Sequence, residues 1–129
     1  MESDRVIFDS SVVIAYYIDD DVHHVEAMRV AEALHDKFIV LHPFVIQEVA
    51  TVLTYRFTAS MTALFFADIR SAQNVAIPTV QIEKDIEFFE RTGKKMSFTD
   101  LALIRLSREM SAPLFTFDKQ ILSFLRNRR

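Results

Sequence analysis

Residues 5–18 read R-V-I-F-D-S-S-V-V-I-A-Y-Y-I, an apolar run that one aspartate and two serines divide into two parts. The first part, residues 5–9, has the length and apolar content of a short buried strand that ends in an acid. The second part, residues 11–18, is typical of a short apolar helix. A strand followed at once by a helix is the unit from which parallel sheets are built.

The rest of the chain repeats this alternation. Further strands are predicted at residues 37–41, 74–80 and 113–117, and helices at residues 24–35, 43–57, 60–73, 81–92 and 97–110 and from 118 onward. Pro78 places the third strand at a sheet edge, and Gly93 suits the left-handed end of a helix. We therefore predict a three-layer α/β fold with helices on both faces of a mostly parallel sheet. Four strands are visible, and a fifth stays open.

Composition limits the classes of protein to consider. A chain of 129 residues that is half hydrophobic, with twelve phenylalanines, fits a single domain over residues 1–129 with a substantial core. The absence of cysteine excludes disulfides and thiolate metal sites. No apolar run reaches the ~18 residues of a membrane span, and the first residues are acidic where a signal peptide would be basic. We expect a cytoplasmic protein.

The formal net charge of −3 argues against a general basic surface that grips nucleic acid. Any nucleic-acid function must therefore depend on a local site, where bound metal ions can supply the missing positive charge.

Four acids are expected at one edge of the sheet. Asp9 and Asp118 follow the first and fourth predicted strands, while Glu48 and Asp100 lie near the starts of helices that face the same edge. Ligands of open parallel sheets bind beyond the carboxyl ends of the strands. Each of three acids also has a structural explanation, because Asp9 and Asp118 can be N-caps and Asp100 can belong to a capping box with Ser97.

Glu48 has no such explanation. On a helical projection it shares a face with Phe44, Val45, Val49 and Val52, which is expected to be buried. Burial of a lone carboxylate costs several kcal/mol unless the group is paired or binds a metal. A functional role is therefore the better interpretation of Glu48.

Together the four carboxylates predict a cation site. Clustered carboxylates repel one another and raise each other's pKa values unless a cation is present. Hard oxygen ligands without cysteine suit Mg²⁺ or Mn²⁺, which can activate water and stabilise charge on a phosphate under attack.

Four motifs in this order resemble the PIN-domain family, in particular the VapC-type toxins of bacterial and archaeal toxin–antitoxin pairs. The motifs are V-I-F-D-S-S-V-V-I-A with Asp9, V-I-Q-E-V-A-T-V-L with Glu48, S-F-T-D-L-A-L-I-R-L-S with Asp100, and P-L-F-T-F-D-K-Q-I with Asp118. The resemblance runs along nearly the whole chain. Each motif alone is weak, but four at this spacing are a strong signal.

The resemblance implies a Mg²⁺- or Mn²⁺-dependent endoribonuclease with a PIN-like fold. By residue-to-residue carry-over, the metal ligands and catalytic residues would be Asp9, Glu48, Asp100 and Asp118, with supporting hydrogen bonds from Ser10 or Ser11 and from Thr116. The resemblance also implies an RNA substrate, a homodimer and a cognate antitoxin protein that occludes the site.

The sequence leaves open the role of two lysines and allows two other functions for the chain. Lys94 and Lys95 precede the Asp100 helix and either reach substrate phosphate or belong to a solvated turn. A phosphatase of the haloacid-dehalogenase type also has an aspartate after its first strand, but it requires D-x-D, and Ser11 occupies the second position here. The stronger alternative is a catalytically silent PIN-like module that binds RNA or a protein.

Overall fold

The structure is a computed structural model that describes residues 4–127. Its sheet contains β1 (Arg5–Phe8), β2 (Phe38–Val40), β3 (Val75–Ala76) and β4 (Leu114–Phe115) in the order β3-β2-β1-β4. All neighbouring strands are parallel. The predicted parallel sheet is thus confirmed, with β3 at an edge as predicted, although β3 is shorter than expected and ends before Pro78. No fifth strand is found among residues 4–127.

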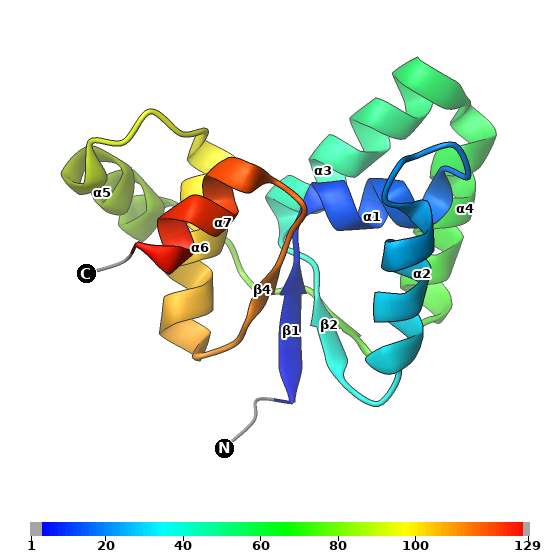
Figure 1. The fold of residues 1–129 in the computed structure, drawn as a ribbon, viewed down its shortest axis with the longest axis horizontal. Coiled ribbons are helices and arrows are strands. Elements are labelled where there is room, and N and C mark those ends of the chain that lie inside the picture. The colour runs from blue at the N-terminus through cyan, green and yellow to red at the C-terminus, as the bar shows by residue number, and fades with distance from the viewer. Residues whose placement is uncertain (1–3, 128–129) are drawn as a thin grey trace.

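The helices cover the two faces of this sheet and give the predicted three-layer architecture. They are α1 (Ser10–Tyr17), α2 (His24–Ala33), α3 (Pro43–Val52), α4 (Ala59–Ser71), α5 (Ile82–Thr92), α6 (Phe98–Met110) and α7 (Lys119–Arg126). Figure 1 shows α1 to α4 on one side of the strands and α5 to α7 on the other. In the described residues, no helix is long and apolar enough to cross a membrane.

One helix differs from its prediction. The sequence predicted a single helix over residues 43–57, but α3 ends at Val52 and continues as a π-helix, η1 (Leu53–Phe57). Leu53 is completely buried at the point where the helix widens. The wider turn is a property of packing in three dimensions, and the apolar pattern of the sequence does not encode it.

The helix ends follow simple local chemistry. The Ser97 hydroxyl accepts a hydrogen bond from the Asp100 amide at 3.0 Å and so caps α6, as its place before the helix predicted. Gly93 ends α5 with a φ of 65°, a left-handed conformation that glycine adopts without steric penalty.

The core lies against both faces of the sheet. Val6, Ile7 and Phe8 of β1 are all buried, because β1 is a central strand with helices on both sides. On α3 the buried line consists of Val45 and Val49, and it continues to Leu53. The three apolar residues of the central strand are therefore held between the two helical layers, and Asp9 follows them directly.

A buried ion pair, which the sequence analysis did not predict, joins α5 to α6. The Arg105 guanidinium donates from Nε to Asp85 Oδ1 at 2.6 Å, from Nη2 to Gln81 at 2.8 Å and from Nη1 to Glu109 at 2.7 Å. Asp85 is only 2% exposed, and its Oδ2 has no hydrogen-bond partner among the described residues. This pair fixes α6, the helix that carries Asp100, against its neighbour.

We predict that Arg105→Met lowers the free energy of unfolding by about 3–5 kcal/mol, because it leaves the Asp85 charge buried without a partner. The double variant Asp85→Leu with Arg105→Met removes that charge and should recover most of the loss. Urea denaturation of both variants and of wild type measures these changes. Arg29→Met, at an exposed position, is the matched control. Equal stability of Arg105→Met and wild type would show that the pair is not a structural requirement.

Candidate active site

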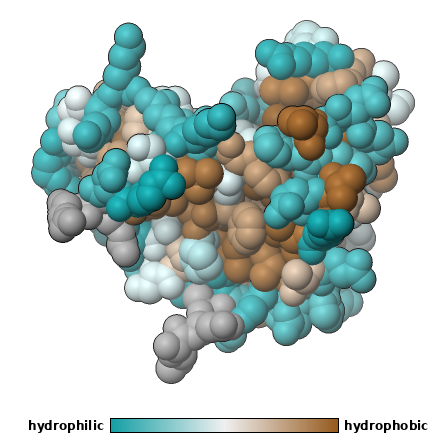
Figure 2. Space-filling view, in the orientation of Figure 1, coloured by the Kyte–Doolittle hydropathy of each residue, from teal (hydrophilic) through white to brown (hydrophobic). Residues whose placement is uncertain are grey.

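The site lies at the edge of the sheet where the strands end. The pairing of Phe8 with Phe115 brings the residues after β1 and β4 side by side. Figure 1 shows α1 and α7 starting from this edge, and Figure 2 shows that the surface is hollowed here between the two halves of the molecule.

Asp9 is the most deeply buried of the four expected acids, with 4% of its surface exposed. Its Oδ2 accepts hydrogen bonds from the Ser11 hydroxyl at 2.8 Å and from the Thr116 hydroxyl at 2.7 Å. Although Asp9 stands at the N-cap position of α1, its side chain makes no capping hydrogen bond. The capping interpretation of its carboxylate is therefore wrong, because the two hydroxyls hold it instead.

Both hydroxyls are themselves oriented by the backbone. Thr116 Oγ1 accepts from the Asp118 amide at 2.9 Å, and Ser11 Oγ accepts from the Phe117 amide at 3.0 Å. Since each hydroxyl oxygen accepts a backbone N–H, its hydrogen is directed at Asp9. The same contacts fix the loop between β4 and α7, which carries Asp118.

Glu48 is exposed, so the prediction that it lies on a buried face is wrong. The buried residues of α3 are Val45 and Val49, and Glu48 lies on the flank of the face that they form. It lines a groove of about 490 Å³ together with Phe44, Gln47, Ser97, Phe98 and Thr99.

Ser10 connects Glu48 to Asp9. Its hydroxyl donates to Glu48 Oε1 at 3.1 Å, and it also lies 3.5 Å from Asp9 Oδ1, at the limit of a hydrogen bond. Three hydroxyls, of Ser10, Ser11 and Thr116, therefore surround Asp9. Ser10 links it to Glu48, and Thr116 links it to the start of α7.

His42, which caps the helix that carries Glu48, was missed by the sequence analysis. It is 3% exposed and is the N-cap of α3, where its Nδ1 accepts from the Phe44 amide at 2.9 Å. Burial lowers the pKa of His42 and the Arg105 charge lowers it further, against an opposing effect of Asp85. The ring therefore stays neutral and keeps its acceptor. The available signal was a polar residue directly before Pro43 at the first position of a helix.

Asp118 caps α7, as one of its two interpretations predicted. Its Oδ1 accepts from the Gln120 amide at 2.8 Å and from the Ile121 amide at 3.1 Å. The cap uses one carboxylate oxygen and leaves Oδ2 outside it. Capping and a second role of this carboxylate are therefore compatible.

Asp100 shows that the four acids share one electrostatic environment. Burial raises the pKa of Asp100 to about 6, and the negative charges of Asp9, Asp118 and Glu48 raise it as well, while a hydrogen bond with Ser97 opposes the change. The side chains that the sequence placed at one sheet edge are thus close enough to repel one another.

The donor set suits a hard divalent cation in its chemistry: all four groups are carboxylates, and the chain has no cysteine. Within residues 4–127, however, no three acidic or histidine side chains are already arranged as a ligand set for a metal ion. Glu48 is exposed and Asp100 is partly exposed, so their side chains have room to turn toward an ion. The residues fit Mg²⁺ or Mn²⁺ only if these two side chains adjust.

Lys94 and Lys95 lie outside the carboxylate cluster. Both are exposed, and they line a different groove between α5, α6 and α7.

Comparisons with known proteins give the family and the fold of the chain. The family model described as "PIN domain" matches residues 6–126. The chain belongs to the PIN-domain family. Among solved structures it is similar to VapC20 of Mycobacterium tuberculosis, a sarcin-ricin loop cleaving toxin, with a TM-score of 0.78 over 92% of this chain and 93% of that chain. The identity is 20%, so the similarity shows the fold alone. No curated protein sequence matches the chain significantly.

We predict that, in metal-free protein, Asp100→Asn raises stability at neutral pH. The pKa of Asp100 is about 6 in the folded state against 3.8 as its ordinary value, so the native state keeps a proton that the unfolded state releases. Stability from this group is therefore lost as pH rises from about 4 to about 6. With solvent screening of a partly exposed group, the gain of the variant should be on the order of 1 kcal/mol at pH above 6.

Urea denaturation in EDTA at several pH values measures this gain. The difference between Asp100→Asn and wild type should disappear below about pH 4, where Asp100 is protonated in both states. Asp36→Asn, an exposed aspartate away from the cluster, is the control. A difference independent of pH would show that charge repulsion is not its cause.

Proposed function

We propose that this chain is a metal-dependent endoribonuclease that hydrolyses phosphodiester bonds in RNA, as the toxin of a type II toxin–antitoxin pair. The observation that carries the proposal is the convergence of Asp9, Glu48, Asp100 and Asp118 at one sheet edge, in a chain of the PIN-domain family. The similarity in fold to a toxin described as cleaving the sarcin-ricin loop supports RNA rather than DNA as the substrate.

The four acids would hold Mg²⁺ or Mn²⁺. When bound, such an ion supplies positive charge for the substrate phosphate and acidifies a water molecule for attack. Asp9 would be the fixed ligand, because Ser11 and Thr116 hold its Oδ2 and leave Oδ1 directed away from them. Ser10 would orient Glu48 through its 3.1 Å hydrogen bond.

Asp118 would combine two roles. Its Oδ1 caps α7 and thereby fixes the carboxylate, and its Oδ2 remains available to the site. The amide of Asp118 in turn holds Thr116, which holds Asp9. These hydrogen bonds would hold the carboxylates of Asp118 and Asp9 in fixed positions relative to the cation.

A cognate antitoxin and a homodimer remain proposals that follow from the VapC-type resemblance. The second candidate function is a catalytically silent module that binds RNA or a protein. It is favoured by the lack of a ready-made group of three metal ligands in the part of the chain that the structure describes. Activity and metal binding, measured separately, distinguish the two.

We predict that Asp118→Asn lowers the rate of RNA cleavage at least about 100-fold while the melting temperature stays unchanged. Asparagine caps a helix as well as aspartate does, so the fold should be preserved while the negative charge is lost. Cleavage of a panel of single-stranded and structured RNAs, in Mn²⁺ and in EDTA, measures the rate. Asp20→Asn, in an exposed turn, is the matched control. Full activity of Asp118→Asn would remove this residue from the catalytic group and leave it as a cap only.

We further predict that Mn²⁺ raises the melting temperature of wild type and does so much less for Asp9→Asn or Glu48→Gln, because a ligand that binds only the native state stabilises it. Differential scanning calorimetry with increasing Mn²⁺ measures the shift. Asp36→Asn should shift like wild type. If Mn²⁺ does not shift wild type and RNA stays intact, the silent binding module becomes the better description.

A further inference from the structure

A second groove, of about 630 Å³, lies between α5, α6 and α7. Its lining includes four cationic residues, Arg91, Lys94, Lys95 and Arg108, and no acidic residue. None of the four makes an ion pair with an acid within residues 4–127. In a chain of net charge −3, this groove concentrates positive charge that has no partner inside the described structure.

The two arginines of the groove are held in place by aromatic rings. The Arg91 guanidinium lies 5.7 Å from the centre of the Phe88 ring, and the Arg108 guanidinium lies 5.7 Å from Phe88 and 5.4 Å from Phe124. Such stacking uses the planar face of a guanidinium and leaves its N–H groups at the edge available. Because the arginines are already ordered, an anion that binds them loses less conformational entropy than it would with free side chains.

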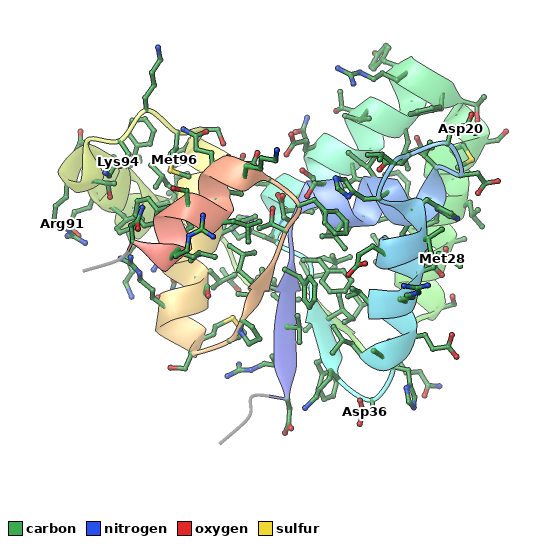
Figure 3. The ribbon with its side chains drawn as sticks, viewed as in Figure 1. Asp20, Met28, Asp36, Arg91, Lys94 and Met96 are labelled. Carbon is green, nitrogen blue, oxygen red and sulfur yellow. The ribbon has the colours of Figure 1, made fainter. Side chains whose placement is uncertain are left out.

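The rest of the lining supplies neutral donors. It includes the amides of Gln120 and Asn127 and the hydroxyls of Thr92 and Ser123. Side chains of these types, together with arginine and lysine, make most protein contacts to phosphate and sugar. The shape is an open groove beside a loop, and Figure 3 shows Arg91, Lys94 and Met96 on the side of the molecule formed by α5 and this loop.

The groove is connected to the carboxylate site by two hydrogen bonds. The Gln120 side chain donates to the Lys95 carbonyl at 2.7 Å, and the Gln120 amide donates to Asp118 Oδ1 at 2.8 Å. One residue thus fixes the lysine loop relative to Asp118. Through Gln120, the groove lies beside the carboxylate that caps α7.

We propose that this groove binds the phosphodiester backbone of single-stranded RNA next to the bond that is cut. The inference rests on the proposed function and adds to it the surface that holds the substrate. It explains how an acidic chain can bind a polyanion, since four cations line a groove that contains no acid. Backbone contacts carry no sequence information, so the groove would contribute affinity and position.

Binding of a short fluorescein-labelled single-stranded RNA tests the groove separately from cleavage. Anisotropy is measured in EDTA at several salt concentrations for wild type, for Lys94→Gln with Lys95→Gln, and for the control Arg29→Gln with Arg70→Gln. The control removes the same charge from the exposed surface of α2 and α4. Melting temperatures of all three proteins verify that they are folded.

The groove variant should bind RNA roughly five- to tenfold more weakly, as expected for the loss of two partly exposed ion pairs. Its plot of log Kd against log salt should become shallower by about 1.4, because each contact to a single strand contributes about 0.7. In cleavage assays KM should rise while kcat changes little. The control should behave like wild type in every measurement.

Other outcomes would overturn the inference or separate it from the proposed function. If the groove variant and the control lose the same RNA affinity, binding depends on the overall charge of the protein and not on the groove. If poly-glutamate displaces the labelled RNA as well as unlabelled RNA of the same charge does, the groove is better described as a site for an acidic protein segment. If wild type cuts RNA and the groove variant keeps its KM, the nuclease stands and the groove proposal fails. If wild type cuts nothing but only the groove variant loses RNA affinity, the groove stands as an RNA-binding surface and the proposed nuclease fails.

Discussion

Asp9 carries its carboxylate at the end of the central strand, in a place that water scarcely reaches. A buried carboxylate needs hydrogen-bond donors, and its burial costs several kcal/mol without them. The donors come from two directions, with Ser11 in the first turn of α1 and Thr116 directly after β4. The hydrogen bonds to Asp9 therefore fix the start of α1 relative to the end of β4. Two further hydrogen bonds extend this arrangement, one from Ser10 to Glu48 and one from the Asp118 amide to Thr116.

This arrangement satisfies Asp9 but does not neutralise the cluster. The hydroxyls orient the carboxylates without adding positive charge, and the raised pKa of Asp100 is the result of burial and of the remaining repulsion. Arg105, a cation on the same helix as Asp100, is already engaged by Asp85 and Glu109. The cations of the second groove line a separate groove, which Gln120 links to Asp118. Negative and positive charge are thus held in adjacent but separate places, which the net charge of −3 conceals.

Local patterns were sufficient to predict most of the fold. Strand positions, the Ser97 cap, the Asp118 cap and the left-handed Gly93 depend on residues within a few positions of each other. Contacts between distant segments were not predictable in this way. The pairing of Asp85 with Arg105 depends on the packing of α5 against α6, and nothing in either segment alone identifies the partner.

The error at Glu48 has the same origin. A helical projection shows which residues share a face, but it does not show where the covering layer ends. Val45 and Val49 lie under that layer, whereas Glu48, on the flank of the same helix, reaches past it to the open sheet edge.

The difference in burial among the acids has a consequence for how they can act. Asp9 and Asp118 are fixed, the first by two hydroxyls and the second by two backbone amides. Glu48 is exposed and accepts a hydrogen bond from Ser10, and Asp100 is partly exposed. A cluster in which two carboxylates are fixed and two are less constrained avoids holding four negative charges at ligand distance when no cation is present. Repulsion among these carboxylates therefore accounts for the absence of a ready-made group of ligands in residues 4–127.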